Sequence, residues 1–174
     1  MLKIYIQGKG DGYEQIELEV PSEEIEDLSK EFIGNVRVKG KLTIIGRRFA
    51  FHGFAECDSK LICDISLEEY TATISKEMKL SYLADTMLRE LARDSDGMNE
   101  ETGEIYLHED QKEIDITDIV REELQLSLPM KRVSPKYEGK SFEDLHPDLG
   151  KKADVKKEED NPEWKEKLKK LKLN

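Results

Sequence analysis

The sequence has few of the residues that staple small secreted proteins or bind metals. Its 174 residues include only two cysteines, Cys57 and Cys63, and three scattered histidines. Two cysteines do not make a disulfide framework, and no second Cys or His pair supports them as zinc ligands. We therefore expect a reduced protein without a metal site or a cofactor. None of the histidines is assigned a catalytic role.

Long apolar runs are also missing. No segment approaches the roughly 18 apolar residues of a membrane helix, and the short apolar stretch at the N-terminus is interrupted by Lys3. The pattern of a secretory signal is absent as well. We expect a cytoplasmic protein that has no membrane partner. No motif points to a small-molecule substrate or to an enzyme.

Charge is abundant and mostly negative. Charged residues make up 39% of the chain and the net charge is −11, which predicts a modest core and a heavily charged surface. Residues 85–128 hold fourteen Asp and Glu and four Lys and Arg, a net charge of −10. A phosphate-binding face needs clustered Lys and Arg, so the chain as a whole is not expected to be wrapped in nucleic acid. The acidic segment is interpreted as a solvated face or as a surface for a basic partner.

Alternation of apolar and polar residues predicts most of the secondary structure. Strands are expected at residues 2–7, 15–20, 70–74 and 104–107, and an antiparallel hairpin at 36–57. Even positions of residues 36–44 are apolar or glycine and odd positions are polar, so one face of the hairpin should be solvated. Gly40 and Gly53 interrupt the apolar rows, which indicates a bulge or a close backbone approach at each.

Two stretches have helical spacing. Ser22 is a good N-cap, and the apolar residues after it follow at i, i+3 and i+7 until Gly34: Ile25, Leu28 and Phe32. A second helix is expected to begin near Asp115 and to close at Pro129. Its core-facing stripe is Ile116, Ile119, Val120 and Leu124.

These elements predict an α+β fold. Residues 1–133 are expected to form one domain with an antiparallel β-sheet core, open or barrel-like, and two main helices. Residues 134–160 have few large apolar side chains and many charges, which predicts a flexible charged arm. Asn161 and Pro162 are standard helix starters, so residues 161–174 should form a basic amphipathic helix. The apolar stripe of that helix is Trp164, Leu168 and Leu171.

Three groups of positive residues are candidate contacts for RNA or for a protein partner. The first lies in the C-terminal helix: Trp164, Lys165, Lys167, Lys169, Lys170 and Lys172. The second is the polar row of the hairpin: Arg37, Lys39 and Lys41. The third is weaker: Arg121, Lys131 and Arg132. Each group could equally be a solvated charged face, and the C-terminal helix could pack on its own domain through Trp164 and Leu168.

Three segments together resemble one known family. Residues 46–70 contain GRRFAFHGFAECDSKL followed by SLEEY, and residues 115–130 contain Asp-Ile, Arg-Glu-Glu-Leu and Leu-Pro-Met. Residues 161–164 read Asn-Pro-Glu-Trp and precede the two leucines of the last stripe. In this order the segments resemble the YceD family of large ribosomal RNA subunit accumulation proteins.

The resemblance has two departures. Cys57 matches the first cysteine of a turn that many members carry, but Lys60 stands where they have the second, and no cysteine follows the Leu-Pro-Met run. A metal-binding role therefore does not carry over. The resemblance implies a non-catalytic role in accumulating large-subunit rRNA, by binding precursor rRNA or an assembling large subunit. The alternative is an acidic adaptor or chaperone that binds a basic ribosomal protein without contacting RNA.

Overall fold

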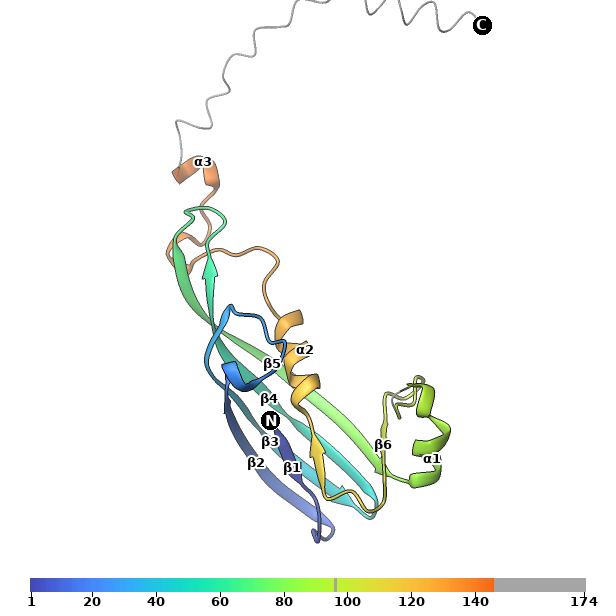
Figure 1. The fold of residues 1–174 in the computed structure, drawn as a ribbon. Helices are drawn as coiled ribbons and strands as arrows, with labels where there is room; N and C mark the ends of the chain where they lie inside the picture. The colour runs from blue at the N-terminus through green and yellow to red at the C-terminus, as the bar shows by residue number, and fades with distance from the viewer. Residues whose placement is uncertain (96, 146–174) are drawn as a thin grey trace, which may run out of the picture.

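The fold is built on one long, twisted β-sheet. The computed structural model describes residues 1–95 and 97–145 (Figure 1). The strand order is β2-β3-β4-β5-β6, with β2 to β5 antiparallel and β6 parallel to β5. The strands are β2 (Gly12–Pro21), β3 (Phe32–Ile45), β4 (Arg48–Ile62), β5 (Glu69–Ala84) and β6 (Ile105–Leu107). Because the edge strands β2 and β6 do not pair with each other, the sheet is open. The α+β class is confirmed and the barrel-like alternative is wrong.

A second layer covers one face of the sheet (Figure 1). It consists of the pair β1 (Lys3–Tyr5) and β7 (Glu113–Asp115) and of α2 (Thr117–Leu126). The short helix α1 (Thr86–Leu91) lies to one side, next to β6. The remaining elements are the 3-10 turns η1 (Ser22–Glu24), η2 (Arg93–Ser95) and η3 (Pro135–Tyr137), and the single-turn helix α3 (Phe142–Leu145). The main core lies between the sheet and this layer.

The expected hairpin is confirmed as β3 and β4. Even residues of β3 and odd residues of β4 face the core, in agreement with the alternation of the sequence. Gly40 pairs directly with Gly53, and a Cβ added to Gly53 would lie 2.6 Å from the Gly40 Cα and 2.8 Å from the Phe51 Cζ. The two glycines therefore mark a close approach over which the Phe51 ring packs. The bulge lies elsewhere, between Ile33 and Arg37.

The predicted helix at residues 22–33 is wrong. After the single turn η1 the chain forms a loop in which Asp27 has a φ of 59°, and β3 begins at Phe32. Ser22 caps no helix, because its buried hydroxyl donates instead to the Phe32 carbonyl oxygen at 3.4 Å. Ile25 and Phe32 are nonetheless buried as expected. A loop therefore buries the apolar residues whose spacing predicted a helix.

The helix expected from Asp115 is confirmed as α2, with a later start. Asp115 belongs to β7, and its carboxylate accepts a hydrogen bond from the Thr117 backbone N–H at 2.9 Å. Of the predicted stripe, three residues are fully buried and Ile119 is half-buried. The three buried residues are Ile116, Val120 and Leu124. Helix α2 therefore presents the predicted face to the sheet.

The packed region continues past residue 133, where we expected the charged arm to begin. Tyr137 is buried in a small cluster with Cys63 and Ile65, and its hydroxyl donates to Glu68 Oε2 at 3.0 Å. This cluster closes the end of the sheet at the turn between β4 and β5. The predicted helix at 161–174 and most of the predicted arm lie outside the described residues.

The close approach of the two glycines gives a stability prediction. Gly53→Ala should lower the free energy of unfolding by about 1–3 kcal/mol, because the new methyl group would clash where β3 and β4 approach closely. Its Cβ would lie 2.3 Å from the Lys39 carbonyl oxygen. Urea denaturation measures the change. Gly10→Ala is the control, since no atom lies within 4 Å of its Cβ. Equal stability of the two variants would contradict the proposed packing.

Candidate nucleic-acid interface

No element of residues 1–95 and 97–145 covers the face of the sheet opposite α2. Its residues are the odd positions of β2, β3 and β5 and the even positions of β4, and each is exposed or half-buried. We call this surface the outer face. The register places Arg37, Lys39 and Lys41 in its middle, between β2 and β4. The structure thus brings the second candidate group together on a solvent-facing sheet.

The three residues of this row have different surroundings. Lys39 forms an ion pair with Glu17, and this hydrogen bond raises the pKa of Lys39. The Lys41 Nζ lies 4.1 Å from the centre of the Tyr13 ring, a cation–π distance. Arg37 is half-buried, and its Nε has no hydrogen-bond partner among the described residues. Of the three, only Lys39 forms an ion pair with an acid in the described part of the chain.

The outer face also contains residues outside the three candidate groups. His52 Nε2 lies 2.7 Å from Glu77 Oε1, and Lys79 lies 3.1 Å from the same oxygen. The hydrogen bond from His52, followed by that from Lys79, lowers the pKa of Glu77. Lys79 was missed because β5 was expected to end at residue 74. Phe54, paired with Lys39 and Glu77 across the strands, is half exposed at 50%.

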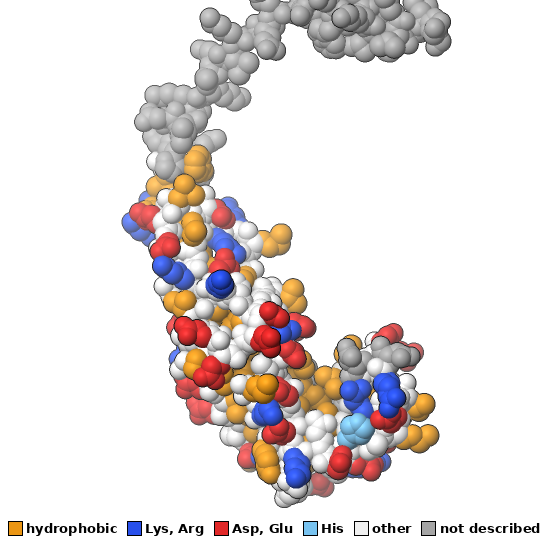
Figure 2. Space-filling model, in the orientation of Figure 1, with side chains coloured by type: hydrophobic (Ala, Val, Ile, Leu, Met, Phe, Trp, Pro, Cys, Tyr) orange, Lys and Arg blue, Asp and Glu red, His pale blue; other side chains and the backbone are white. Residues whose placement is uncertain are grey.

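The two faces of the molecule differ in charge. The outer face of β2 to β5 carries six Lys and Arg and six Asp and Glu, so its net charge is zero apart from His52. On the other side, α2 and the loop of residues 22–31 together carry eight Asp and Glu against two Lys and Arg. Figure 2 views this side and shows the acidic side chains over α2 and the loop. Phosphate would be repelled there and tolerated on the outer face.

The third candidate group is divided by the structure. Arg132 makes two hydrogen bonds to the carboxylate of Glu31, at 2.5 and 3.0 Å, and its backbone N–H donates to Asp64. Arg121 pairs with Asp118 at 2.9 Å and lies on the acidic side. Lys131 is exposed and forms no ion pair within the described part of the chain. Arg132 thus connects three segments of the fold.

The first candidate group cannot be placed. Trp164 and the five lysines of residues 165–172 lie outside the described residues.

The two cysteines are buried and unpaired with each other. Burial raises the pKa of Cys57. For Cys63, burial alone would raise the pKa, but hydrogen bonds from the Ser134 backbone and from Ser66 outweigh it and lower the pKa to about 7. Among residues 1–95 and 97–145, no group of three His, Cys, Asp or Glu is placed to hold a metal ion. No described helix is long and apolar enough to cross a membrane.

Comparison with known proteins then decides the family. The family model described as large ribosomal RNA subunit accumulation protein YceD matches residues 51–172. The chain belongs to the YceD family. No curated protein and no solved structure matches the chain.

The YceD match covers some candidate residues and omits others. It includes most of β4, all of β5 and α2, and every candidate of the first and third groups. The row of Arg37, Lys39 and Lys41 precedes it. YceD is not a known enzyme family, and none of the candidate residues described above forms a nucleophile–base arrangement.

The two-point contact of Arg132 gives a second prediction. Arg132→Ala should lower the urea midpoint. The side chain of Arg132 binds Glu31 and its backbone binds Asp64, so together these contacts hold the 22–31 loop to the β4–β5 turn. Arg132→Lys should fall between this variant and the wild type, since an ammonium group cannot reproduce the two parallel hydrogen bonds. Lys131→Ala is the neighbouring control and should leave the midpoint unchanged. A lysine variant as stable as the wild type would show that charge alone suffices.

Proposed function

We propose that this YceD-family chain supports accumulation of large-subunit rRNA as a non-catalytic factor that binds precursor rRNA or an assembling large subunit. The family match over residues 51–172 is the observation that carries the biological role. The proposed mode of contact is supported by the uncovered outer face. In this proposal the chain acts by binding, and no residue is given a catalytic role.

The outer face is the part of the described body best suited to touch RNA. It is broad and solvent-exposed, and its acids and bases balance, whereas the α2 side is strongly acidic. Lys39, Lys41 and Lys79 supply cationic groups, and Phe54 supplies an exposed ring between them. Single-stranded bases stack on such rings while lysines contact the backbone. We propose that RNA approaches this face, with the C-terminal lysines as further candidates.

Salt dependence tests the proposed contact. Removing two phosphate contacts in the double variant Lys39→Ala, Lys41→Ala should weaken precursor rRNA binding. The slope of log binding constant against log salt should flatten by about 1.4, at roughly 0.7 per contact with single-stranded RNA. Lys30→Ala with Lys112→Ala is the control for lost charge away from this face. An unchanged slope in the outer-face variant would exclude these lysines.

A second candidate function rests on the acidic side. The α2 and loop surface, with eight acids and two bases, could bind a basic ribosomal protein without any RNA contact. Binding of the purified protein to large-subunit ribosomal proteins and to precursor rRNA separates the two functions. Binding to protein alone, sensitive to Glu122→Lys but not to Lys41→Ala, would favour this adaptor.

The biological role is tested by depletion. Removing the protein from cells should lower the amount of large-subunit rRNA relative to small-subunit rRNA, because large-subunit precursors would no longer be supported. Quantitative measurement of the two mature rRNAs gives the ratio, and re-expression of the wild-type chain should restore it. A ratio that does not change on depletion would contradict the proposed role.

A further inference from the structure

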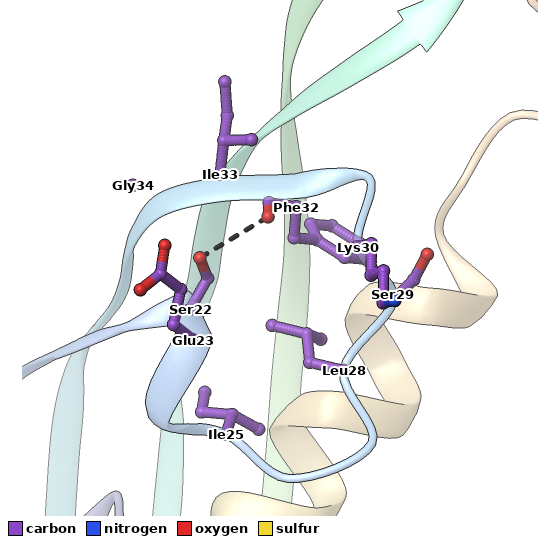
Figure 3. Close-up of a pocket in the computed structure, with 9 residues that line it drawn as sticks. All are labelled: Ser22, Glu23, Ile25, Leu28, Ser29, Lys30, Phe32, Ile33 and Gly34. Carbon is purple, nitrogen blue, oxygen red and sulfur yellow. Dashed lines mark hydrogen bonds between the residues drawn. The ribbon is translucent and has the colours of Figure 1, made fainter.

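The 22–31 loop encloses an open hollow of about 380 Å³ (Figure 3). Ile25, Leu28 and Phe32 line its inner side, with Ile33 at the start of β3. Ile25 and Phe32 belong to the main hydrophobic core, and Leu28 packs against it. Ile33 is 38% exposed. The hollow therefore joins the surface to the core through apolar side chains, and its size suits an aromatic ring.

The hollow is lined by one acid, Glu23, and one base, Lys30, and the acids Glu24 and Glu26 follow Glu23 in the loop. Glu23, Glu24 and Glu26 form no ion pair with any other described residue. A second hollow of about 230 Å³ extends this surface toward α2. Its charged lining is five acids and one base, Arg121, which pairs with Asp118; the acids are Glu24, Glu26, Asp27, Asp115 and Asp118. An occupant of this surface should combine an apolar anchor with several positive charges.

One segment of this chain has that composition. Residues 161–174 contain Trp164, the only tryptophan, in an apolar stripe with two leucines, and carry five lysines against two glutamates. We propose that residues 161–174 dock in cis on the 22–31 loop, with Trp164 in the hollow and the lysines along the unpaired acids Glu23, Glu24 and Glu26. This docking does not depend on the proposed RNA contact of the outer face, although it would take the C-terminal lysines out of such a contact, and it brings a basic segment to an acidic surface.

The chain is long enough for this contact. Arg132 binds Glu31, next to Phe32, so the hollow lies beside residue 132. Leu145 is 13 residues after Arg132, so it lies at most about 47 Å from residue 132. The 19 residues from Leu145 to Trp164 can span about 63 Å, which is more than this distance. The segment can therefore return to the loop wherever Leu145 lies. Because it is tethered, its docking should be independent of protein concentration.

The single tryptophan makes docking measurable in the full-length chain, since tryptophan emission reports on residue 164 alone. Docked Trp164 should emit at a shorter wavelength than free N-acetyltryptophanamide and should be protected from acrylamide quenching. Ile33→Asp should remove both effects. Ile45→Asp is the matched control, because it makes the same change in the same strand at a residue that is 68% exposed and away from the hollow. Circular dichroism should show that both variants remain folded.

Charge reversal gives an independent arm of the test. Glu23→Lys at the rim should weaken docking roughly twofold to fivefold, the range for exposed ion pairs, while Glu101→Lys should not. Added salt should increase the quenching of the wild type. Fully quenchable Trp164 in the wild type, or equal quenching in the Ile33 and Ile45 variants, would overturn the proposal. Protection that depends on protein concentration would also overturn it, because the occupant would then be a second copy.

Discussion

The structure depends on the antiparallel register of its three long strands, β3, β4 and β5. From Arg48 opposite Leu83 to Ile62 opposite Glu69, β4 and β5 stay paired without a shift. Side chains alternate with a period of two, so a slip of one residue would move the core row to the solvent face. The contact of Gly40 with Gly53 under the Phe51 ring fixes β3 against β4 at one point of this ladder. Burial under α2 and solvation of the outer face both follow from that register.

The elements that could be predicted are those in which local pattern and tertiary burial agree. The β3–β4 hairpin and the buried stripe of α2 follow directly from their periods of two and 3.6. The end of β5 could not be predicted, because Lys76 occupies a core-facing position and breaks the alternation. Lys76 pairs there with Glu123 of α2 at 3.2 Å, a partner that the local pattern does not contain. The pairing of β1 with β7 is equally non-local.

The failure at residues 22–33 has a different cause. Ile25, Leu28 and Phe32 are spaced like one face of a helix, yet a loop that crosses the sheet edge buries two of them. The backbone of Asp27, in the left-handed region at φ 59°, is incompatible with a continuous helix. Apolar spacing reports which residues are buried more reliably than how the chain bends between them. The hollow between these side chains exists because this segment is a loop, and a helix would not have produced it.

The candidate site was predictable only as far as local alternation reaches. Alternation alone placed Arg37, Lys39 and Lys41 on one solvated face, but it could not reveal which of their charges are already compensated. In the sequence, Arg132 is one of two adjacent basic residues. Its acceptor Glu31 lies 101 residues earlier in the chain, so the local sequence could not reveal that its charge is paired.

The separation of charge is then a consequence of the fold, not of overall composition. A chain with a net charge of −11 would repel RNA if its acids were spread evenly over the surface. Here α2 and the 22–31 loop carry eight Asp and Glu against two Lys and Arg, while the opposite face of the sheet is balanced. An RNA strand would therefore be oriented before any base is contacted, with the sheet toward the phosphates and α2 away from them. The same separation leaves the acidic side free for a basic segment, so the two surfaces need not compete for one partner.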